Sequence, residues 1–346
     1  MPIPGALGLD HYAFAVPRLN DAIDFFSDVL GAQLVMELEL TPEAGSWMRD
    51  QLDVHERASA RAAQLRLGPV TNIELWDYQV PERREVPPLL NERGGHHLAF
   101  YVDDVDAAAA FLERQDGVRV LGEPVDTDEG LDQVEHWIYF QAPWGLPMKL
   151  LSTPTAGATS DRPQRVGPFP QWGPNSKLPT ARNVDHLGIT VPDLSTAVEL
   201  FTRYLGAELV YNGQPAFYNA EFTKRQFGIS GDCSLHRALL RLGPTTNLEI
   251  MQFDGLVSSG SHPRNSDVGG HHLALAVEDV DRAAAYLADV EGIDTFGVRQ
   301  EADGGEIKGD RWQYFRLPWG LYGEVLKMPH GVPFGRPHTA DRFEYT

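Results

Sequence analysis

Large and small side chains alternate along a short stretch that occurs twice in the chain, at residues 94–102 and 269–277. In the second copy, His272 precedes a run from Leu273 to Val277 in which larger apolar residues are separated by alanines. A period of two residues is typical of a strand with two different faces. The face with the larger side chains can pack on a helix. The other face carries a histidine beside residues that are too small to obstruct it. This pattern predicts a strand that forms one wall of a metal site.

The chain is a tandem duplication. His11 aligns with His186, and the same offset of 175 residues holds along both halves without a net insertion. Other landmarks keep this register: Leu30–Ala32 with Leu205–Ala207, Leu65–Pro69 with Leu240–Pro244, and Pro143–Leu146 with Pro318–Leu321. Chance similarity does not keep register over such a length, so the two halves are copies of one unit.

Each half repeats again, more weakly. A strand that contains His11, His97, His186 or His272 is followed each time by a helical pattern, at 19–30, 105–112, 194–205 and 280–287. Further strands follow each helix, the clearest at 72–78, 137–140, 247–253 and 312–315. These patterns predict an α+β fold built from four tandem βαβββ modules.

The segment between the halves is rich in proline, glycine, serine and threonine, a composition typical of a linker. We therefore expect an N-terminal domain at 1–152, a linker at 153–182 and a C-terminal domain at 183–346. The tail after Pro329 has no regular pattern.

Composition narrows the classes of function. Forty-nine acidic residues against 29 basic ones give a net charge of −20, which disfavours nucleic acid or an anionic membrane as a partner. The single Cys233 excludes an intrachain disulfide and a thiolate metal cage. The N-terminal residues lack the pattern of a signal peptide, and no apolar run reaches membrane-spanning length, so we expect a cytoplasmic protein.

Four polar residues lie on predicted strands of the second half: His186, Glu249, His272 and Glu324. Alternation places each of them on the face opposite the larger apolar residues. Two imidazoles and two carboxylates suit one divalent ion, Fe²⁺, Mn²⁺, Co²⁺, Ni²⁺ or Zn²⁺. Two glutamates inside one sheet otherwise require exposure, because a buried carboxylate without a partner is costly. We therefore predict a metal site from these four residues.

These motifs resemble the vicinal oxygen chelate superfamily, which includes glyoxalase I, methylmalonyl-CoA epimerase, extradiol dioxygenases, and bleomycin and fosfomycin resistance proteins. The matching segments are Asp185–Ile189, Asn247–Ile250, His271–Leu275 and Phe315–Glu324. The resemblance covers both halves and implies two glyoxalase/dioxygenase-like domains, with metal ligands on the first and last strands of paired modules. It indicates the fold strongly and the reaction weakly, because the superfamily hosts several chemistries.

The first half contains His11, Glu74 and His97, but Lys149 occupies the position of Glu324. A cation there would repel a metal and pair with Glu74, so we expect a degenerate site in this half. Which modules pair is open. If modules cross over, as in some glyoxalases, the complete set becomes His11, Glu74, His272 and Glu324. The long linker favours the uncrossed arrangement of two self-contained halves.

The resemblance favours proton transfer next to a carbonyl. The metal would chelate a hydroxyketone and stabilise the enediolate, while Glu249 or Glu324 removes the proton. Among such enzymes, the epimerases of keto-cyclitols such as 2-epi-5-epi-valiolone are the leading specific hypothesis.

Extradiol cleavage of a catechol by Fe²⁺ is the alternative, with His186, His272 and Glu324 as ligands. Tyr314 occupies the spacing of the active-site tyrosine of those enzymes, and His236 lies near the position of their additional histidine. A further histidine expected upstream of Tyr314 is missing, however, and Glu249 would occupy a position that oxygen needs. A metal-free small-molecule binding protein is the third class, and it has little use for four ligands.

Two segments outside the clear pattern could cover the substrate. Residues 41–63 contain an amphipathic pattern around Trp47, Met48, Leu52 and Val54, and the counterpart at 214–237 offers Phe217, Tyr218, Phe222 and His236. By analogy with the superfamily we expect a small-molecule substrate and a homodimer. The native metal, the substrate and its stereochemistry stay open.

Overall fold

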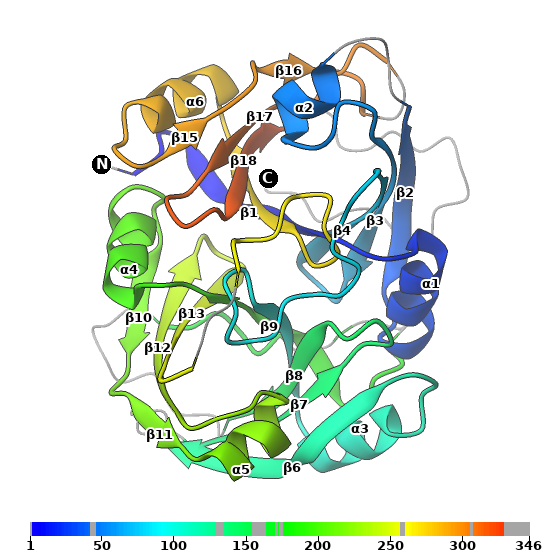
Figure 1. Cartoon of the computed structure of the whole chain (residues 1–346), viewed down its shortest axis with the longest axis vertical. Coiled ribbons are helices and arrows are strands. Elements are labelled where there is room, and N and C mark those ends of the chain that lie inside the picture. The colour runs from blue at the N-terminus through cyan, green and yellow to red at the C-terminus, as the bar shows by residue number, and fades with distance from the viewer. Residues whose placement is uncertain are drawn as a thin grey trace.

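The computed structural model of the chain describes residues 2–41, 46–128, 134–153, 164–169, 172, 176–256, 260–304 and 307–328. Within these residues the strands form two nine-stranded sheets, with helices packed beside them (Figure 1). The four predicted βαβββ-like modules are all present. The fold class is therefore confirmed. The tail after Pro329 and much of the predicted linker lie outside the described residues.

The modules are numbered in chain order. Module 1 contains β1 (Ala6–Ala15), α1 (Leu19–Asp24) with the π-helical turn η1 (Phe25–Val29), β2 (Gln33–Leu40), α2 (Trp47–Leu52), β3 (Ser59–Leu67) and β4 (Thr71–Gln79). Module 2 contains β5 (His96–Val102), α3 (Val105–Leu112), β6 (Arg119–Asp128), β7 (Val134–Gln141) and β8 (Pro147–Ser152). Module 3 contains β9 (Ala181–Thr190), α4 (Leu194–Arg203), β10 (Glu208–Asn212), β11 (Ala216–Tyr218), α5 (Ala220–Phe222) with the π-helical turn η2 (Thr223–Phe227), β12 (Cys233–Leu242) and β13 (Thr246–Asp254). Module 4 contains β14 (His271–Val277), α6 (Val280–Ala288), β15 (Asp294–Thr295), β16 (Gln300–Glu301), β17 (Arg311–Arg316) and β18 (Tyr322–Lys327).

An aspartate begins three of the four helices that follow a first strand. Asp104, Asp193 and Asp279 each accept a hydrogen bond from the backbone N–H three residues further on. This side-chain cap satisfies a donor that the first turn of a helix cannot pair internally. In modules 2, 3 and 4, the repeated aspartate therefore caps the helix that follows the first strand.

The modules cross over between the two halves. β1 of module 1 pairs with β14 of module 4, with Tyr12 opposite Leu273, and β5 of module 2 pairs with β9 of module 3, with Leu98 opposite Leu187. One sheet, sheet A, therefore runs β15-β17-β18-β14-β1-β4-β3-β2, with β16 as its ninth strand paired to β17. The other, sheet B, runs β10-β12-β13-β9-β5-β8-β7-β6, with β11 as its ninth strand paired to β12. The uncrossed arrangement of two self-contained halves is wrong, and the crossed alternative is the one that the structure adopts.

Two connecting segments make this crossover, and they pack against each other. Segment 80–95 leads from sheet A to sheet B, and segment 255–270 leads back. The N–H of Val268 donates to the carbonyl of Arg84 at 2.9 Å, and the N–H of Arg84 donates to Asp267 at 2.9 Å. The long linker permits either pairing of modules, so these contacts between the connecting segments, which the sequence pattern does not reveal, support the crossed one.

The paired glycines of the repeated stretch lie where the two connections meet. Gly94 and Gly269 both adopt positive φ angles, +78° and +82°. A Cβ on Gly94 would lie 2.3 Å from Cδ of Pro263, and a Cβ on Gly269 would lie 2.6 Å from Cδ of Pro88. Each connection therefore presses a proline against a glycine of the other, and only glycine provides the space and the backbone conformation.

The buried apolar residues divide between the two faces of the sheets. One large cluster contains residues from all four modules and from α1, α3, α4 and α6, including Leu273, Leu275 and Val277. On the other faces, one smaller cluster belongs to sheet A and another to sheet B. The face of β14 that carries the larger side chains therefore packs on helices, as expected, and His272 lies on the opposite face.

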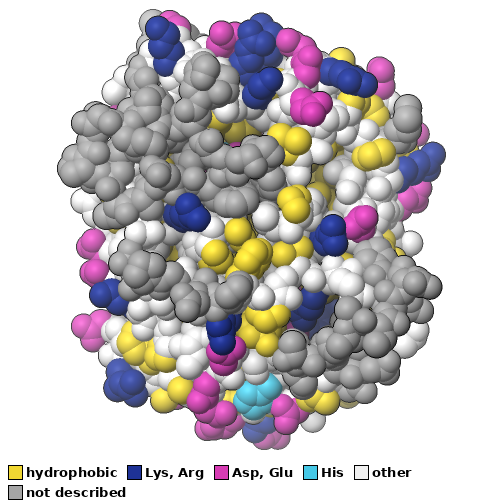
Figure 2. All heavy atoms as spheres, turned by 180° about the vertical axis from the view of Figure 1, so that it is seen from behind, with side chains coloured by type: hydrophobic (Ala, Val, Ile, Leu, Met, Phe, Trp, Pro, Cys, Tyr) yellow, Lys and Arg dark blue, Asp and Glu magenta, His cyan; other side chains and the backbone are white. Residues whose placement is uncertain are grey.

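The surface shows no single dominant charge on the face seen in Figure 2, where acidic and basic side chains are interspersed around apolar residues. Among the described residues, none of the helices has both the length and the apolar character needed to span a bilayer.

Replacing either crossing glycine should destabilise the fold more than replacing a glycine in an open turn. Gly94→Ala combines a left-handed backbone, worth about 1–2 kcal/mol, with overpacking against Pro263, worth about 1–3 kcal/mol. Gly145→Ala is the matched control, because Gly145 has φ +91° but its Cβ would lie 3.8 Å from the nearest atom. Urea denaturation should show the larger loss for Gly94→Ala, and equal losses would contradict the crossing contact.

A buried histidine in the second connection should make the protein sensitive to acid. Burial lowers the pKa of His262 to about 4, although its ring bonds the carbonyl of Pro263 at 3.0 Å. The unfolded chain, with a histidine pKa near 6.5, binds this proton first, so the free energy of unfolding falls as pH falls from 6.5 to 4. His262→Gln should reduce that slope by about 1.4 kcal/mol per pH unit. Urea denaturation between pH 5 and 6 measures it, and an unchanged slope would disprove the assignment.

Candidate active site

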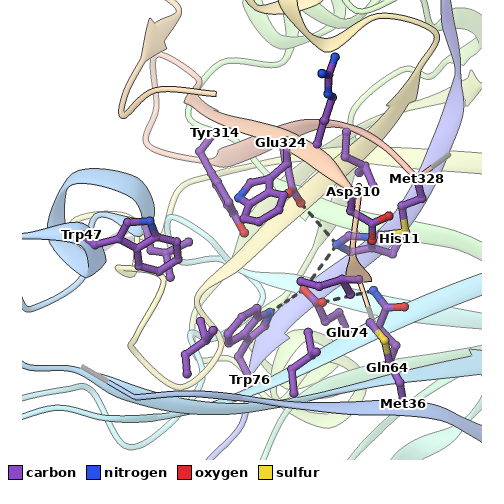
Figure 3. A pocket seen from close by; sticks show the side chains of 17 residues that line it. His11, Met36, Trp47, Gln64, Glu74, Trp76, Asp310, Tyr314, Glu324 and Met328 are labelled. Carbon is purple, nitrogen blue, oxygen red and sulfur yellow. Dashed lines mark hydrogen bonds and ion pairs between the residues drawn. The ribbon is translucent and has the colours of Figure 1, made fainter. Parts of the chain in front are cut away.

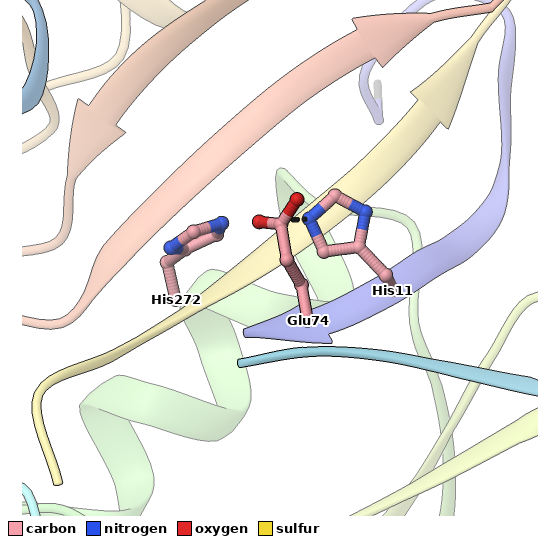
Figure 4. A group of neighbouring side chains, drawn as sticks. All are labelled: His11, Glu74 and His272. Atoms are coloured by element: carbon pink, nitrogen blue, oxygen red, sulfur yellow. Dashed lines mark ion pairs between the residues drawn. The ribbon is translucent and has the colours of Figure 1, made fainter. Parts of the chain in front are cut away.

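The crossover brings one complete set of predicted ligands together on sheet A. His11 on β1, Glu74 on β4, His272 on β14 and Glu324 on β18 lie on four neighbouring strands. The Nε2 atom of His11 lies 3.5 Å from Glu74 Oε2 and 3.6 Å from Glu324 Oε2, and His272 Nε2 lies 3.5 Å from Glu324 Oε2. Figure 4 shows the side chains of His11, Glu74 and His272 directed toward one another. We call these four residues the first cluster.

Burial makes the charges of the first cluster strongly dependent on one another. Each of its side chains is less than one-tenth exposed. Burial opposes a charge on His11, but the carboxylates of Glu74 and Asp10 outweigh it and raise the pKa of His11 to about 10. Burial likewise opposes a charge on Glu74, and His11 reverses this and lowers the pKa of that carboxyl group. A positive charge is therefore favoured at the centre of this cluster.

The ring of His11 is oriented by Asp10, whose carboxylate accepts from Nδ1 at 2.8 Å. This contact leaves Nε2, the atom that faces the cluster, available as a ligand. His186 on sheet B has the same arrangement with Asp185, at 2.7 Å. The repeated Asp-His pair thus has a physical role in both halves.

Two further residues hold Glu74, and the sequence reasoning missed both. The indole N–H of Trp76 donates to Glu74 Oε2 at 2.6 Å, and the amide of Gln64 donates to Oε1 at 3.3 Å. At the offset of 175 residues their counterparts are Met251 and Leu239, which cannot donate such bonds. This difference between copies is the signal that could have identified them.

Three residues of the first cluster, His11, Glu74 and Glu324, line a cavity of about 160 Å³. Figure 3 shows Glu74 and Glu324 on either side of the His11 imidazole, with Trp47 across the cavity. The walls are mostly large apolar and aromatic side chains: Met36, Leu38, Leu40, Trp47, Leu52, Trp76, Ile307, Trp312, Leu326 and Met328. Helix α2 supplies Trp47 and Leu52, so the amphipathic pattern predicted around them forms a helix that covers the site.

Tyr314 also lines the cavity, and its hydroxyl lies 3.4 Å from Nε2 of His272. Burial, followed by the nearby Glu324 carboxylate, raises the pKa of Tyr314 well above its usual value. The phenol therefore stays protonated and can donate a hydrogen bond into the cavity.

Three of the predicted site residues belong to sheet B instead. His186 and Glu249, expected beside His272 and Glu324, lie with His97 in a second cluster. Its donor atoms are 3.2–3.5 Å apart. His236 is also on sheet B, where it pairs with Asp254 at 3.0 Å and is partly exposed. These placements correct the uncrossed ligand set and the assignment of His236, and both follow from the crossing of the modules.

Lys149 occupies the fourth position of the second cluster, as predicted for a degenerate site. Its carboxylate partner is not the predicted one. Lys149 bonds Glu135 rather than Glu74, which lies in the first cluster. Burial disfavours a charge on Glu249, but Lys149, His186 and Arg237 together lower the pKa of that carboxyl group. Arg165 neutralises Asp185 in the same network.

The charges around the two clusters decide which one suits a metal. In the second cluster three carboxylates already face three cations: Glu135, Asp185 and Glu249 against Lys149, Arg165 and Arg237. In the first cluster, the only lysine or arginine among the described residues lining the cavity is Arg311, which pairs with Glu301 at 2.8 Å. The contacts of 3.5–3.6 Å that join His11 to both glutamates and His272 to Glu324 are also compatible with one shared ion. The first cluster therefore fits a divalent cation.

Aromatic side chains fill the space beside the second cluster. The ring of Phe227 on η2 stacks on Trp137 and meets the edge of Tyr139. Tyr218 and Phe222 pack against Phe227 in turn, whereas Phe217 is 68% exposed. Segment 214–237, which was expected to cover a cleft, therefore fills the space beside the second cluster with its own side chains.

Comparison with known proteins identifies the family. A model of the glyoxalase/bleomycin resistance protein/dioxygenase superfamily matches residues 8–147, and a second model with the same description matches residues 185–307. The chain is 47% identical over 164 residues to a 2-epi-5-epi-valiolone epimerase from Actinomyces sp., which is 47% of this chain and 88% of that protein. It is also 32% identical over 127 residues to the uncharacterized protein YaeR of Escherichia coli K12, which is 36% of this chain and 81% of that protein.

The fold has solved counterparts as well. A glyoxalase I mutant from Zea mays superposes with a TM-score of 0.57 at 18% sequence identity, covering 92% of each chain. At this identity the likeness concerns the fold alone. Together with the matches in both halves, it shows that the chain belongs to the glyoxalase/bleomycin resistance protein/dioxygenase superfamily.

Proposed function

We propose that the chain is a metal-dependent epimerase that removes a proton next to the carbonyl group of a small hydroxyketone, of the sugar or cyclitol type. The observation that carries this proposal is the convergence of two imidazoles and two carboxylates, of which His11, Glu74 and Glu324 line a cavity of about 160 Å³. The likeness to a 2-epi-5-epi-valiolone epimerase supports the same substrate class.

His11, Glu74, His272 and Glu324 would hold the metal, which polarises a ketone oxygen when bound. Glu74 is restrained by Trp76 and Gln64, so it suits a fixed ligand. Glu324 lies beside both histidines and lines the cavity, and we assign the removal of the proton to its carboxylate. Glu249, the other candidate base, lies in the second cluster, so we do not assign the removal of the proton to it. The neutral phenol of Tyr314 can donate to the substrate oxygen.

The alternatives have weaker support. An extradiol dioxygenase needs open positions for a catechol and for oxygen, whereas the first cluster offers four protein ligands. A metal-free binding protein would have to bury two carboxylates beside histidines without a strong cation, which is unfavourable. We therefore place the dioxygenase second and the binding protein third.

The crossed fold bears on the expected homodimer. The relative from Actinomyces is little more than half as long as this chain, because the same 164 residues are 88% of it and 47% of this chain. In this chain both halves contribute to the first cluster, so the site is complete within one chain. The homodimer and the identity of the metal stay predictions.

Metal binding should depend on the first cluster and not on the second. His11→Ala removes a ligand and should weaken Mn²⁺ binding by at least about a hundredfold. His186→Ala is the matched control, because His186 is the aligned residue of the second cluster, and its affinity should stay within about threefold of the wild type. Calorimetric titration and metal content per chain measure both, and equal losses would refute the assignment.

Proton transfer should be visible without oxygen. Under anaerobic conditions in D₂O, the metal-loaded protein should exchange deuterium into 2-epi-5-epi-valiolone and form its epimer. Glu324→Gln should slow both processes by about 10²–10⁴-fold, because the positioned base is lost. Glu249→Gln should leave them unchanged. Oxygen consumption with a catechol, and no exchange with the hydroxyketone, would favour the dioxygenase.

A further inference from the structure

The internal duplication provides two copies of the same pocket, one open and one filled. At the offset of 175 residues, Trp312 and Tyr314 correspond to Trp137 and Tyr139. The pairs occupy the same register, since Trp312 lies opposite Leu326 and Trp137 lies opposite Leu151. The filled copy therefore shows what these two aromatic rings accept between them.

The tyrosine ring has nearly the same position relative to the cluster histidine in both copies. The rings of His272 and Tyr314 are 5.1 Å apart at 74°, and those of His97 and Tyr139 are 5.2 Å apart at 72°. The ends of the covering segments also correspond, because Asp53 follows α2 and Gly228 follows η2, and these aligned residues both adopt the left-handed conformation. A position defined in one copy can thus be transferred to the other.

In the filled copy, one phenyl ring occupies the space between these walls. The ring of Phe227 lies parallel to Trp137 with centroids 5.7 Å apart, and it meets Tyr139 edge-on at 5.7 Å and 82°. The aligned residue in the open copy is Leu52, which lines the cavity. The open cavity of about 160 Å³ is close to the roughly 150 Å³ that accommodates benzene in a protein interior.

The other tryptophans of the open cavity are already engaged. Trp76 stacks on Tyr78 at 5.3 Å and gives its N–H to Glu74, and Trp47 donates its N–H to Gln300 at 2.9 Å. Trp312 is the one whose counterpart carries a stacked six-membered ring. Tyr314 lies two residues further along β17, and its hydroxyl is close to His272, so it lies between Trp312 and the first cluster.

We propose that the six-membered ring of the substrate lies flat on Trp312 with its edge toward Tyr314, in the place that the Phe227 ring takes in the filled copy. This inference rests on the proposed function, since it requires a ring-shaped substrate. Trp312 then determines specificity by offering an apolar face to one side of the ring. Leu52 leaves room where the other copy has a phenylalanine.

Substitutions at Trp312 and Leu52 test the inference through binding rather than through the metal. With 2-epi-5-epi-valiolone as substrate and Mn²⁺ as metal, Trp312→Ala should raise KM at least about tenfold with little change in kcat. Trp312→Phe should restore KM to within about threefold. Leu52→Phe should raise KM at least about a hundredfold, because it introduces the plug of the filled copy. All three variants should bind Mn²⁺ as the wild type does.

Trp137→Phe is the matched control, and its KM should equal that of the wild type. A wild-type KM in either Trp312→Ala or Leu52→Phe, with the enzyme active, overturns the inference and leaves the proposed function standing. An inactive wild type with normal Mn²⁺ binding overturns the proposed function, and the inference with it. Leu52→Phe keeps the test decisive if Trp312→Ala does not fold.

Discussion

Contacts between segments 80–95 and 255–270 hold the two halves of the chain in their crossed arrangement. Gly94 and Gly269 admit prolines of the opposite connection, and the backbone of Val268 bonds that of Arg84. This contact commits module 1 to module 4. The β1–β14 pairing then places His11 and Glu74 beside His272 and Glu324. If the modules paired within each half instead, His186 and Glu249 would take the places of His11 and Glu74 beside His272 and Glu324.

Once the modules are paired, charge separates the two clusters. Both contain two histidines and a glutamate at nearly the same spacing. Where the first cluster has Glu324, the second has Lys149. Arg165 and Arg237 add two more positive charges there, so the carboxylates of the second cluster are neutralised by side chains of the protein. The first cluster keeps its excess of negative charge in a buried place, where only a cation can offset the cost of desolvation.

Packing reinforces the same division. In the first cluster, donors from Trp76 and Gln64 hold a carboxylate at the floor of a cavity, and Leu52 leaves that cavity open. In the second, aligned apolar residues replace both donors and Phe227 fills the space. One copy thus has a cavity beside its polar cluster, whereas aromatic side chains occupy the corresponding space in the other.

The modules could be predicted from the residues alone, because periodicity and the Asp-His and Gly-Gly repeats are local patterns that indicate which residues form strands and which face each residue occupies. It also predicted Glu324 and His272 as members of the site, and Lys149 as the cation that makes the second set degenerate. It could not decide which histidine and glutamate complete the set, nor see that His236 lies on the other sheet. Those depend on which strands pair, and alternation within a strand carries no information about its partner. The pairing of strands depends on contacts between two irregular segments, far apart in the chain, in which a proline of each packs against a glycine of the other.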